Sequence, residues 1–213
     1  MKYAAVWLSV LCVVVFVLQA VFGTELFLLI NQLKWSEPWR LLLSVFAHSD
    51  SAHLLSNLFA LMLFGLVLEG MVGAGKVFWL FIVSGVLVNV LSPYPSSLGA
   101  SGAIYAIIGA LAVLRPFMVI YVQWLPMPMV LAAFVYLLQD IFGVFYPSGV
   151  GNLAHISGLF IGFSAGFFWR RRFGDAFHFS RKSRKSRVIE QRLDKWERRY
   201  MGGKGIGKSV DSK

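Results

Sequence analysis

Charged residues are scarce over most of this chain, and cysteine is nearly absent. Charged residues make up 14% of the 213 residues and hydrophobic residues 58%, whereas soluble domains are about 45–50% apolar. Because so apolar a surface is not stable in water, the composition excludes an ordinary soluble domain for most of the chain. The single cysteine, Cys12, excludes an intrachain disulfide. We therefore expect a protein that uses the lipid bilayer as its solvent.

Negative charge is also rare, with 10 acidic residues against 20 Lys and Arg and a net charge of +10. A basic protein can indicate a nucleic-acid partner. Fifteen of the 20 basic residues, however, lie between Arg170 and Lys213, directly after an apolar body. Since cytoplasmic segments of membrane proteins are enriched in Lys and Arg, this distribution favours a cytoplasmic anchor and no nucleic-acid partner.

Long apolar runs fill the first 170 residues. A membrane-spanning helix needs ~20 mostly apolar residues. The sequence predicts six helices, over residues 3–22, 52–70, 77–91, 101–114, a stretch from Pro126 or Pro128 to 142, and 153–169. The first run is longer than the apolar core of a signal peptide, which predicts a retained helix. The expected fold class is all-α, a polytopic six-helix membrane bundle over 1–170 with a basic tail over 171–213.

The segments between these helices predict how the bundle is oriented. Residues 24–50 mix Trp, charge and apolar runs, which is typical of a loop lying partly in the membrane interface. Six helices place both termini on one side, and Lys2, Lys76 and Arg115 fall on that side with the tail. The positive-inside rule then predicts cytoplasmic termini.

Four polar residues lie within the apolar body, where polar groups are costly and often functional. His53 and Asn57 are four residues apart on one helix face, Ser101 lies in GASGAIYAIIGA, and His155 lies in NLAHISGLFIGFSAG. Each residue alone has a structural explanation, as a small packing residue or an interhelical hydrogen bond. Together they supply a nucleophile, a base and two oxyanion donors.

A glycine ridge predicts how the serine and the histidine meet. The glycines recur every four residues on the sixth predicted helix, at Gly158, Gly162 and Gly166. Small residues allow close approach of two helices, so the ridge predicts contact between the fourth and sixth helices. No acidic residue is clearly placed to orient His155, because the depth of Asp140 cannot be read from the sequence. We therefore favour a dyad over a triad.

From about Trp35 to Trp169 the sequence resembles the rhomboid family. The motifs that carry the resemblance are Trp39-Arg40, HSDSAHLLSN at 48–57, Glu69, GASG at 99–102, Tyr105, Asp140, Asn152 and AHISGLFIG from Ala154. A single GxSG is weak evidence, but this series of motifs in the right order is specific.

The resemblance implies an intramembrane serine endopeptidase of the cell membrane that cleaves transmembrane protein substrates, without a metal or a cofactor. It implies Ser101 and His155 as catalytic residues, with an oxyanion hole formed by His53, Asn57 and the Ser101 backbone N–H. Tyr105 would pack against the imidazole, and the small residues Gly99 and Gly102 would support the serine. Trp39-Arg40 and Glu69 resemble scaffold elements. The site would open to the extracytoplasmic side.

Two other functions remain open from the sequence. A catalytically silent relative would bind membrane clients without cutting them, although such relatives typically lack the serine or the histidine. A small transporter would also contain intramembrane polar residues, but we find no internal repeat between the two halves of the chain.

The basic tail contains two further patterns. Residues from Val188 to Tyr200 place apolar side chains on one helical stripe, which fits either an amphipathic surface helix or a solvated tail. Residues Gly202 to Ser209 match GxxxxGK[ST], the phosphate-binding loop pattern. A working loop of this kind follows a strand and opens a helix. A charged segment precedes this one and four residues follow it, so no nucleotide partner is predicted.

Overall fold

The fold is known from a computed structural model. It describes residues 2–122, 124–146, 151–172, 192 and 195. The predicted stripe of the tail and its GxxxxGK[ST] run lie outside the described residues, apart from 192 and 195. The chain divides into two compact units, Met1–Arg170 and Arg171–Lys213.

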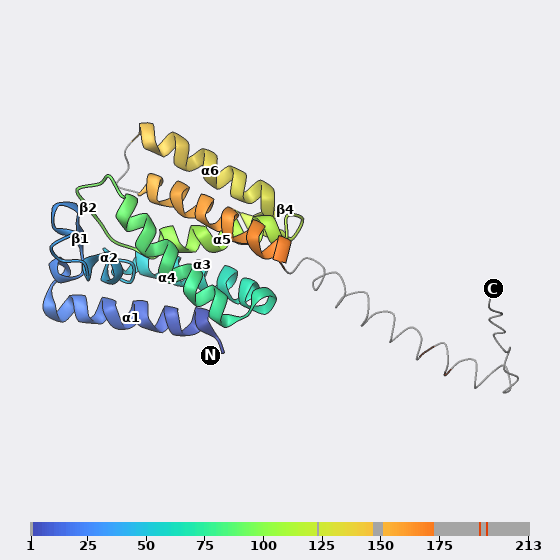
Figure 1. The fold of residues 1–213 in the computed structure, drawn as a ribbon, viewed down its shortest axis with the longest axis horizontal. Coiled ribbons are helices and arrows are strands. Elements are labelled where there is room, and N and C mark those ends of the chain that lie inside the picture. The colour runs from blue at the N-terminus through green and yellow to red at the C-terminus, as the bar shows by residue number, and fades with distance from the viewer. Residues whose placement is uncertain (1, 123, 147–150, 173–191, 193–194, 196–213) are drawn as a thin grey trace, which may run out of the picture. The chain divides into compact units, whose positions relative to one another are not determined.

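The first unit is mostly helical (Figure 1). Its long helices are α1 (Ala4–Phe22), α3 (Ser51–Val72), α4 (Ala74–Leu91), α5 (Ser101–Leu114), α6 (Met129–Phe145) and a last helix over 152–172. Each lies within a few residues of a predicted helix. Within the described part of the chain, α1, α3 and α4 are long and apolar enough to cross a membrane, and α5 and α6 are shorter apolar helices.

Single residues end several helices. Gly73, at φ 90°, is the only residue between α3 and α4, so the turn is shorter than the gap between the predicted helices over 52–70 and 77–91. A glycine adopts this backbone conformation without the steric cost that other residues incur, which allows α4 to begin directly at Ala74. Asp50 caps the start of α3, where its carboxylate accepts the His53 backbone N–H at 2.8 Å.

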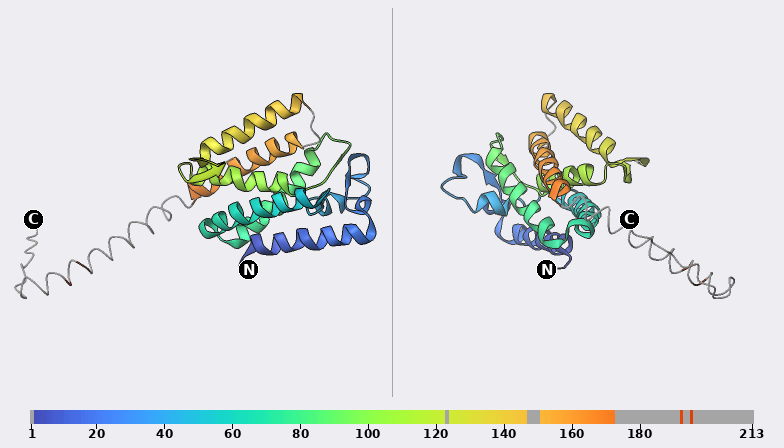
Figure 2. Two further views of the ribbon diagram at one scale, coloured as in Figure 1. Left: turned by 180° about the vertical axis from the view of Figure 1, so that it is seen from behind. Right: turned by 45° about the vertical axis from the view of Figure 1, so that its right-hand side comes forward.

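Helix α5 forms the centre of the unit. Eleven of its fourteen residues are buried, and it contacts α3, α4 and α6. On the far side of α3 and α4 lies α1, as the views of Figure 2 show. Ser101 is the first residue of α5, so the candidate nucleophile lies at the end of the most enclosed helix.

Glycine contacts bring α5 and the 152–172 helix together. A Cβ added at Gly158 would lie 2.0 Å from the Gly102 carbonyl oxygen, and one at Gly162 would lie 2.0 Å from the Ala106 carbonyl oxygen. Because both contacts are to backbone atoms, no side-chain movement could make room for a methyl group. The predicted close approach through the glycine ridge is confirmed.

Two small antiparallel two-stranded sheets depart from the expected all-α fold. Strand β1 (Leu29–Ile30) pairs with β2 (Ser96–Ser97), with Leu29 opposite Ser97, and joins the first loop to the segment before Ser101. Strands β3 (Val119–Val122) and β4 (Leu125–Pro128) connect α5 to α6. Residues 24–50 also form three short helices: η1 (Thr24–Leu26), η2 (Asn31–Leu33) and α2 (Arg40–Leu43).

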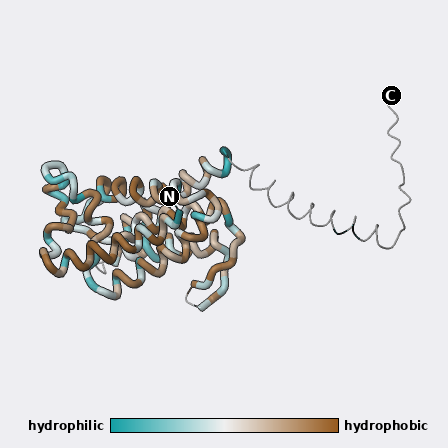
Figure 3. Tube along the Cα trace, turned by 90° about the horizontal axis from the view of Figure 1, so that it is seen from below, coloured by the Kyte–Doolittle hydropathy of each residue, from teal (hydrophilic) through white to brown (hydrophobic). Residues whose placement is uncertain are grey.

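Hydrophobic residues predominate along the helices, as the colouring of the trace in Figure 3 shows, and many large apolar side chains are exposed. On α6, for example, Phe134, Phe142 and Phe145 are exposed. Soluble proteins rarely expose contiguous apolar surface of this extent, whereas lipid chains solvate it. The unit therefore has the surface of a membrane-embedded protein.

Candidate active site

Ser101 and His155 meet near the starts of two adjacent helices. The His155 Nε2 atom lies 2.8 Å from Ser101 Oγ, within hydrogen-bond distance. Ser101 is partly exposed, and His155 is buried with 8% of its surface accessible. The two residues are 54 positions apart in the sequence, and the glycine contacts between their helices bring them together.

Asp140 on α6 contacts the other nitrogen of the same imidazole. Its Oδ1 atom lies 2.9 Å from His155 Nδ1, and the residue is 4% exposed. The preference for a dyad therefore missed an acidic residue that lies in line with the histidine and the serine. An ionised carboxylate accepts the Nδ1–H, which leaves the lone pair of Nε2 facing the Ser101 hydroxyl. This is the tautomer that a general base needs.

Tyr105 covers one face of the imidazole. The two rings stack with their centroids 4.2 Å apart and an interplanar angle of 12°. Tyr105 lies one helical turn after Ser101 on α5, so the helix that carries the serine also restricts the rotation of the histidine.

Asn57, on α3, has a buried side-chain amide whose N–H group lacks a hydrogen-bond partner in the described chain. The residue is 7% exposed, and its Nδ2 atom has no hydrogen-bond partner among the described residues. Buried polar groups are nearly always paired, and exceptions often have a functional reason. A free Asn57 N–H group is suited to donate to a ligand.

His53 lies one turn before Asn57, beside the backbone that leads to Ser101. A Cβ at Gly99 would lie 2.9 Å from His53 Cε1 and 3.0 Å from its Nε2. Gly99 also has φ +124°, which strains any other residue. Glycine at this position thus allows the Nε2 edge of His53 to approach the backbone next to the serine. At Gly102, a Cβ would lie 2.9 Å from Val88, so this glycine serves the packing of α5.

The loops around the site are held by hydrogen bonds from neighbouring elements. The Gly99 N–H donates to the Ser44 carbonyl at 2.8 Å, and Asn89 donates to Ser44 Oγ at 2.9 Å. The Gln19 amide on α1 both donates to the backbone of His48 and accepts from it, at 3.1 and 2.9 Å. The backbone that leads to the serine is therefore tied to Ser44 and, through Ser44, to α4, while α1 holds the loop at His48.

His48 lies beside His53, but its contacts indicate a structural role. Its Nδ1 atom is 3.0 Å from the Phe46 carbonyl, and its ring centroid is 5.0 Å from that of His53. Burial, followed by the neighbouring His53, lowers the pKa of His48 to about 4. The ring is therefore neutral near pH 7, which fits a structural role.

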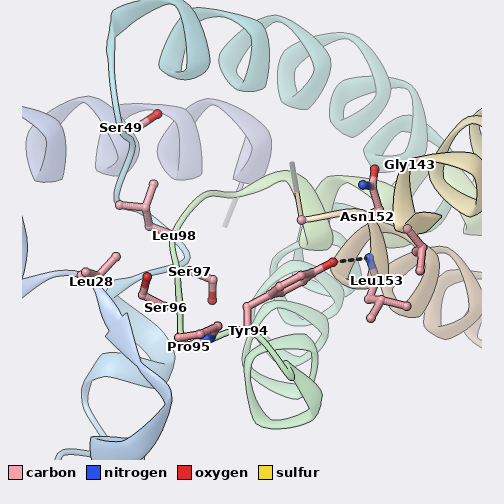
Figure 4. Close-up of a pocket in the computed structure, with 12 residues that line it drawn as sticks. Leu28, Ser49, Tyr94, Pro95, Ser96, Ser97, Leu98, Gly143, Asn152 and Leu153 are labelled. Carbon is pink, nitrogen blue, oxygen red and sulfur yellow. Dashed lines mark hydrogen bonds between the residues drawn. The ribbon is translucent and has the colours of Figure 1, made fainter. Parts of the chain in front are cut away.

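A cleft of about 510 Å³ lies beside the segments that lead to Ser101 and His155 (Figure 4). It is lined by the segment that precedes Ser101, by the end of α6 and by the residues that precede His155. The lining residues are Leu28, Ser49, Tyr94, Pro95, Ser96, Ser97, Leu98, Gly143, Val144, Gly151, Asn152 and Leu153. The Tyr94 hydroxyl accepts the Leu153 N–H at 3.2 Å and ties the two walls together. The size falls within the range of ~300–1,000 Å³ that is usual for ligand sites.

Two predicted scaffold elements make specific contacts away from the cleft. The Arg40 guanidinium donates to the carbonyls of Glu25 and Leu28 and pairs with Glu37, so it ties the first loop together. The Glu69 carboxylate accepts the backbone N–H groups of Tyr3 and Ala5 at 2.6 and 3.2 Å. In the described ranges, no three His, Cys, Asp or Glu residues gather as metal ligands would.

Comparison with known proteins gives consistent matches. Residues 35–172 match the family model described as the Rhomboid domain. The chain is 35% identical over 153 residues to Rhomboid protease GluP of Bacillus subtilis, which covers 68% of this chain and 28% of that protein. It is 27% identical over 168 residues to Rhomboid protease GlpG of Haemophilus influenzae, which covers 75% and 87%. The match to RHOMBOID-like protein 6, mitochondrial, of Arabidopsis thaliana is 32% identical over 137 residues and covers 62% and 44%.

Proposed function

This chain belongs to the rhomboid family, and from that membership we propose that it is an intramembrane serine endopeptidase. The observation that carries the proposal is the line of three groups formed by Ser101 Oγ, His155 and Asp140, with contacts of 2.8 and 2.9 Å. Ser101 is the nucleophile, His155 the general base, and Asp140 a positioning residue that keeps a proton on Nδ1.

In the proposed reaction, Ser101 Oγ attacks the carbonyl carbon of the scissile peptide while His155 Nε2 takes the hydroxyl proton. His155 then gives this proton to the leaving amine, and an acyl-enzyme remains. Water, activated by the same imidazole, hydrolyses the ester and restores the serine.

The tetrahedral intermediate carries a negative oxygen that needs donors. The Asn57 side chain, which has no other partner in the described chain, and His53 lie on the α3 side of the serine. The Ser101 backbone N–H is one of the first N–H groups of α5, which have no acceptor within the helix. These three groups form the proposed oxyanion hole, and the positive end of the α5 dipole adds to it.

We propose that all six long helices cross the membrane and that both termini are cytoplasmic. Tyr3 contacts Glu69 and Arg170 contacts the Val113 carbonyl, so the start of α1 and the ends of α3, α5 and the last helix share one end of the bundle. Lys2, Lys76 and Arg115 adjoin these helix ends. Ser101 and His155 lie near the starts of α5 and the last helix, at the other end of the bundle. By the positive-inside rule, this end would face the extracytoplasmic side.

The proposed substrates are membrane proteins with a single transmembrane segment. The cleft beside the serine combines apolar walls with hydroxyl groups, and the adjacent lipid-facing surface would let a helix approach from within the bilayer. A segment with small residues near the scissile bond would unwind there and expose its backbone to Ser101. Regular helices bury their carbonyls in hydrogen bonds, so local unwinding is required for attack.

A fluorophosphonate probe tests this proposal, because it labels only an activated serine. The detergent-purified full-length protein should be labelled, whereas Ser101→Ala and His155→Ala should not. Ser157→Ala is the matched control, because its hydroxyl lies on the same helix as His155 and donates to its own helix at the Leu153 carbonyl. In liposomes, the wild type and Ser157→Ala should cleave a model transmembrane substrate. Ser101→Ala and His155→Ala should not cleave it.

Absence of labelling in folded wild-type protein would overturn the proposal, as would equal labelling of Ser101→Ala. The remaining interpretation would then be a relative that binds membrane clients without cutting them. Labelling that requires Ser101 and His155, but without cleavage of any transmembrane substrate, would contradict the proposed substrate class alone.

A further inference from the structure

A short chain of hydrogen bonds runs from the oxyanion histidine to the surface. Ser49 Oγ lies 3.1 Å from His53 Nδ1 and donates to Asp50 Oδ2 at 2.7 Å. The other carboxylate oxygen, Asp50 Oδ1, accepts the His53 backbone N–H at 2.8 Å. His53, Ser49 and Asp50 thus form a closed group at the start of α3.

Counting protons determines the direction of this chain. The backbone N–H of His53 and the Ser49 hydroxyl hold the pKa of Asp50 below its usual value, so its carboxylate is ionised and can only accept. A hydroxyl has one proton, and in this arrangement Ser49 donates it to Asp50. The contact between Ser49 Oγ and the ring therefore needs its proton from His53, which places an N–H at Nδ1.

This placement has a consequence at the other ring nitrogen. A neutral imidazole has one N–H, so a proton on Nδ1 leaves Nε2 with a bare lone pair. The Nε2 edge is the one that approaches Gly99 and the serine. A bare Nε2 repels an oxyanion, and it becomes a donor only when the ring gains a second proton.

We infer that Ser49 and Asp50 are positioning residues that make the oxyanion contribution of His53 depend on its protonation. The inference rests on the proposed function, since it concerns the same oxyanion hole. In the charged ring Nδ1–H donates to Ser49 and Nε2–H donates to the oxyanion, while the ionised Asp50 compensates the charge through the hydroxyl. In the neutral ring the hole loses one of its three donors.

The groups around His53 set where this transition lies. Burial disfavours the charged ring most, and Asp50 favours it. His155 across the site and His48 on the preceding loop act against it when they are charged. His48 is neutral near pH 7 because of its burial. Ser49 also lines the cleft, so a bound substrate would exclude water from the hydroxyl and strengthen its two hydrogen bonds (Figure 4).

Two substitutions separate this mechanism from a purely structural role. Asp50→Asn keeps the helix cap, because Asn is as good a cap as Asp and its amide oxygen can accept the His53 N–H. The amide NH₂ then takes the position of Oδ2 and donates to Ser49, whose own proton turns toward His53 Nδ1. The direction of the chain reverses, and the neutral ring carries its proton on Nε2. Ser49→Ala removes the chain altogether.

The first experiment measures the tautomer directly. Full-length protein with ¹⁵N-labelled histidine contains four such residues, His48, His53, His155 and His178, and a His53→Phe sample assigns the signals of His53. We expect the neutral wild-type ring to show a protonated Nδ1 and a bare Nε2, and the Asp50→Asn ring to show the opposite. A wild-type ring with its proton on Nε2 would overturn the inference.

The second experiment measures kcat/KM of substrate cleavage against pH. Wild-type activity should decline as rising pH removes the charge of His53. Above that decline Asp50→Asn should be about tenfold or more active than wild type, because one oxyanion donor typically contributes ~10²–10³ in kcat. Ser56→Ala is the matched control, since this exposed α3 hydroxyl donates only to the His53 carbonyl of its own helix, and its profile should follow the wild type.

Superimposable profiles of wild type, Asp50→Asn and Ser49→Ala would overturn the catalytic part of the inference. Failure of the proposed function gives a different result. A protein that neither labels nor cleaves would contradict the protease proposal, while the histidine spectra would still decide whether Ser49 and Asp50 hold the proton on Nδ1.

Discussion

The two histidines of the site have similar surroundings and opposite tasks. His155 Nδ1 contacts the carboxylate of Asp140, which is 4% exposed, within the helical body. His53 Nδ1 contacts the exposed hydroxyl of Ser49, with the exposed carboxylate of Asp50 behind it. In both cases a carboxylate, directly or through a hydroxyl, favours an N–H at Nδ1.

The same tautomer has different consequences on the two sides. The proposed base, His155, needs a bare Nε2 to accept the serine proton, and its Asp140 contact favours one in the neutral ring. The proposed oxyanion donor, His53, needs an N–H at Nε2, which the inferred neutral ring lacks. A carboxylate that contacts Nδ1 of an imidazole is therefore not by itself a sign of catalytic function. Its effect depends on whether Nε2 has to accept a proton or donate one.

The largest expected effect comes from separating the helices on the His155 side. In Gly158→Ala the new methyl group would lie 2.0 Å from the Gly102 carbonyl oxygen, so the two helices must move apart. We expect a loss of about 10³-fold or more in kcat/KM, since a displacement of about 1 Å in a catalytic contact can cost ~10² and here the whole helix shifts. The measurement is cleavage of a transmembrane substrate in liposomes, together with Tm.

Gly70→Ala is the matched control for this substitution. It adds the same methyl group to a helix, but beyond the adjacent residues and backbone of its own helix no described atom lies within 4 Å of the new position. Its activity and Tm should stay close to wild type. A Gly158→Ala protein with wild-type activity would show that the close approach of the two helices is not required.

The second prediction breaks the α3 side of the site while it leaves the His155 side intact. Asn57→Ala should reduce kcat by roughly 10²–10³-fold with little change in KM, as loss of one oxyanion donor typically does. Because the buried Asn57 Nδ2 has no partner in the described part of the molecule, its removal should not lower Tm.

Asn89→Ala provides the contrast. Its amide donates to the Leu41 carbonyl and to Ser44 Oγ, both at 2.9 Å, so its removal leaves buried acceptors unpaired. This variant should lower Tm by more than Asn57→Ala does. If Asn57→Ala instead lost stability and kept its kcat, Asn57 would be a structural residue.

Much of this arrangement follows from local sequence patterns. The helices are predictable because uninterrupted apolar runs end near Gly70, at Arg115-Pro116 or at charged loops. The meeting of Ser101 and His155 is predictable from the glycine spacing on the last helix, since that pattern indicates a close contact between helices.

Other parts depend on information that is not local. Asp140 is 15 residues from His155, and its contact depends on how far α6 extends before the chain returns. Ser49 and Asp50 stand inside the motif HSDSAHLLSN, but their roles depend on proton positions rather than on residue types. The β1–β2 sheet has only two residues in each strand, too few for a periodic pattern.

The third prediction concerns Asp140, whose buried carboxylate contacts His155 and is replaced by an amide. Asp140→Asn should reduce kcat by about 10–10²-fold, less than the ~10⁴ known for a triad aspartate. The amide oxygen can still accept the His155 Nδ1–H, and Tyr105 still stacks on the ring, so only part of the tautomer preference is lost. The rate of fluorophosphonate labelling should fall by a similar factor.

Glu69→Gln is the control for removal of a carboxylate from the helical body. Glu69 accepts two backbone N–H groups at the start of α1 and lies at the opposite end of the bundle from the serine. The amide should lower Tm without a change in the labelling rate. An Asp140→Asn protein that labels as fast as wild type would remove Asp140 from the mechanism and restore the dyad.

The smallest expected effect concerns the ring that covers His155. Tyr105→Phe keeps the aromatic face that stacks at 4.2 Å, so kcat should stay within about twofold of wild type. Tyr105→Leu removes the stack, which is worth about 0.5–1.5 kcal/mol for an aromatic pair, so a decrease of up to ~10-fold is expected. The decrease should be larger in the Asp140→Asn background than in wild type, because the ring and the carboxylate restrain the same imidazole and each compensates for loss of the other. A double-mutant cycle on kcat measures this coupling, and strictly additive effects would show that Tyr105 packs against His155 without orienting it.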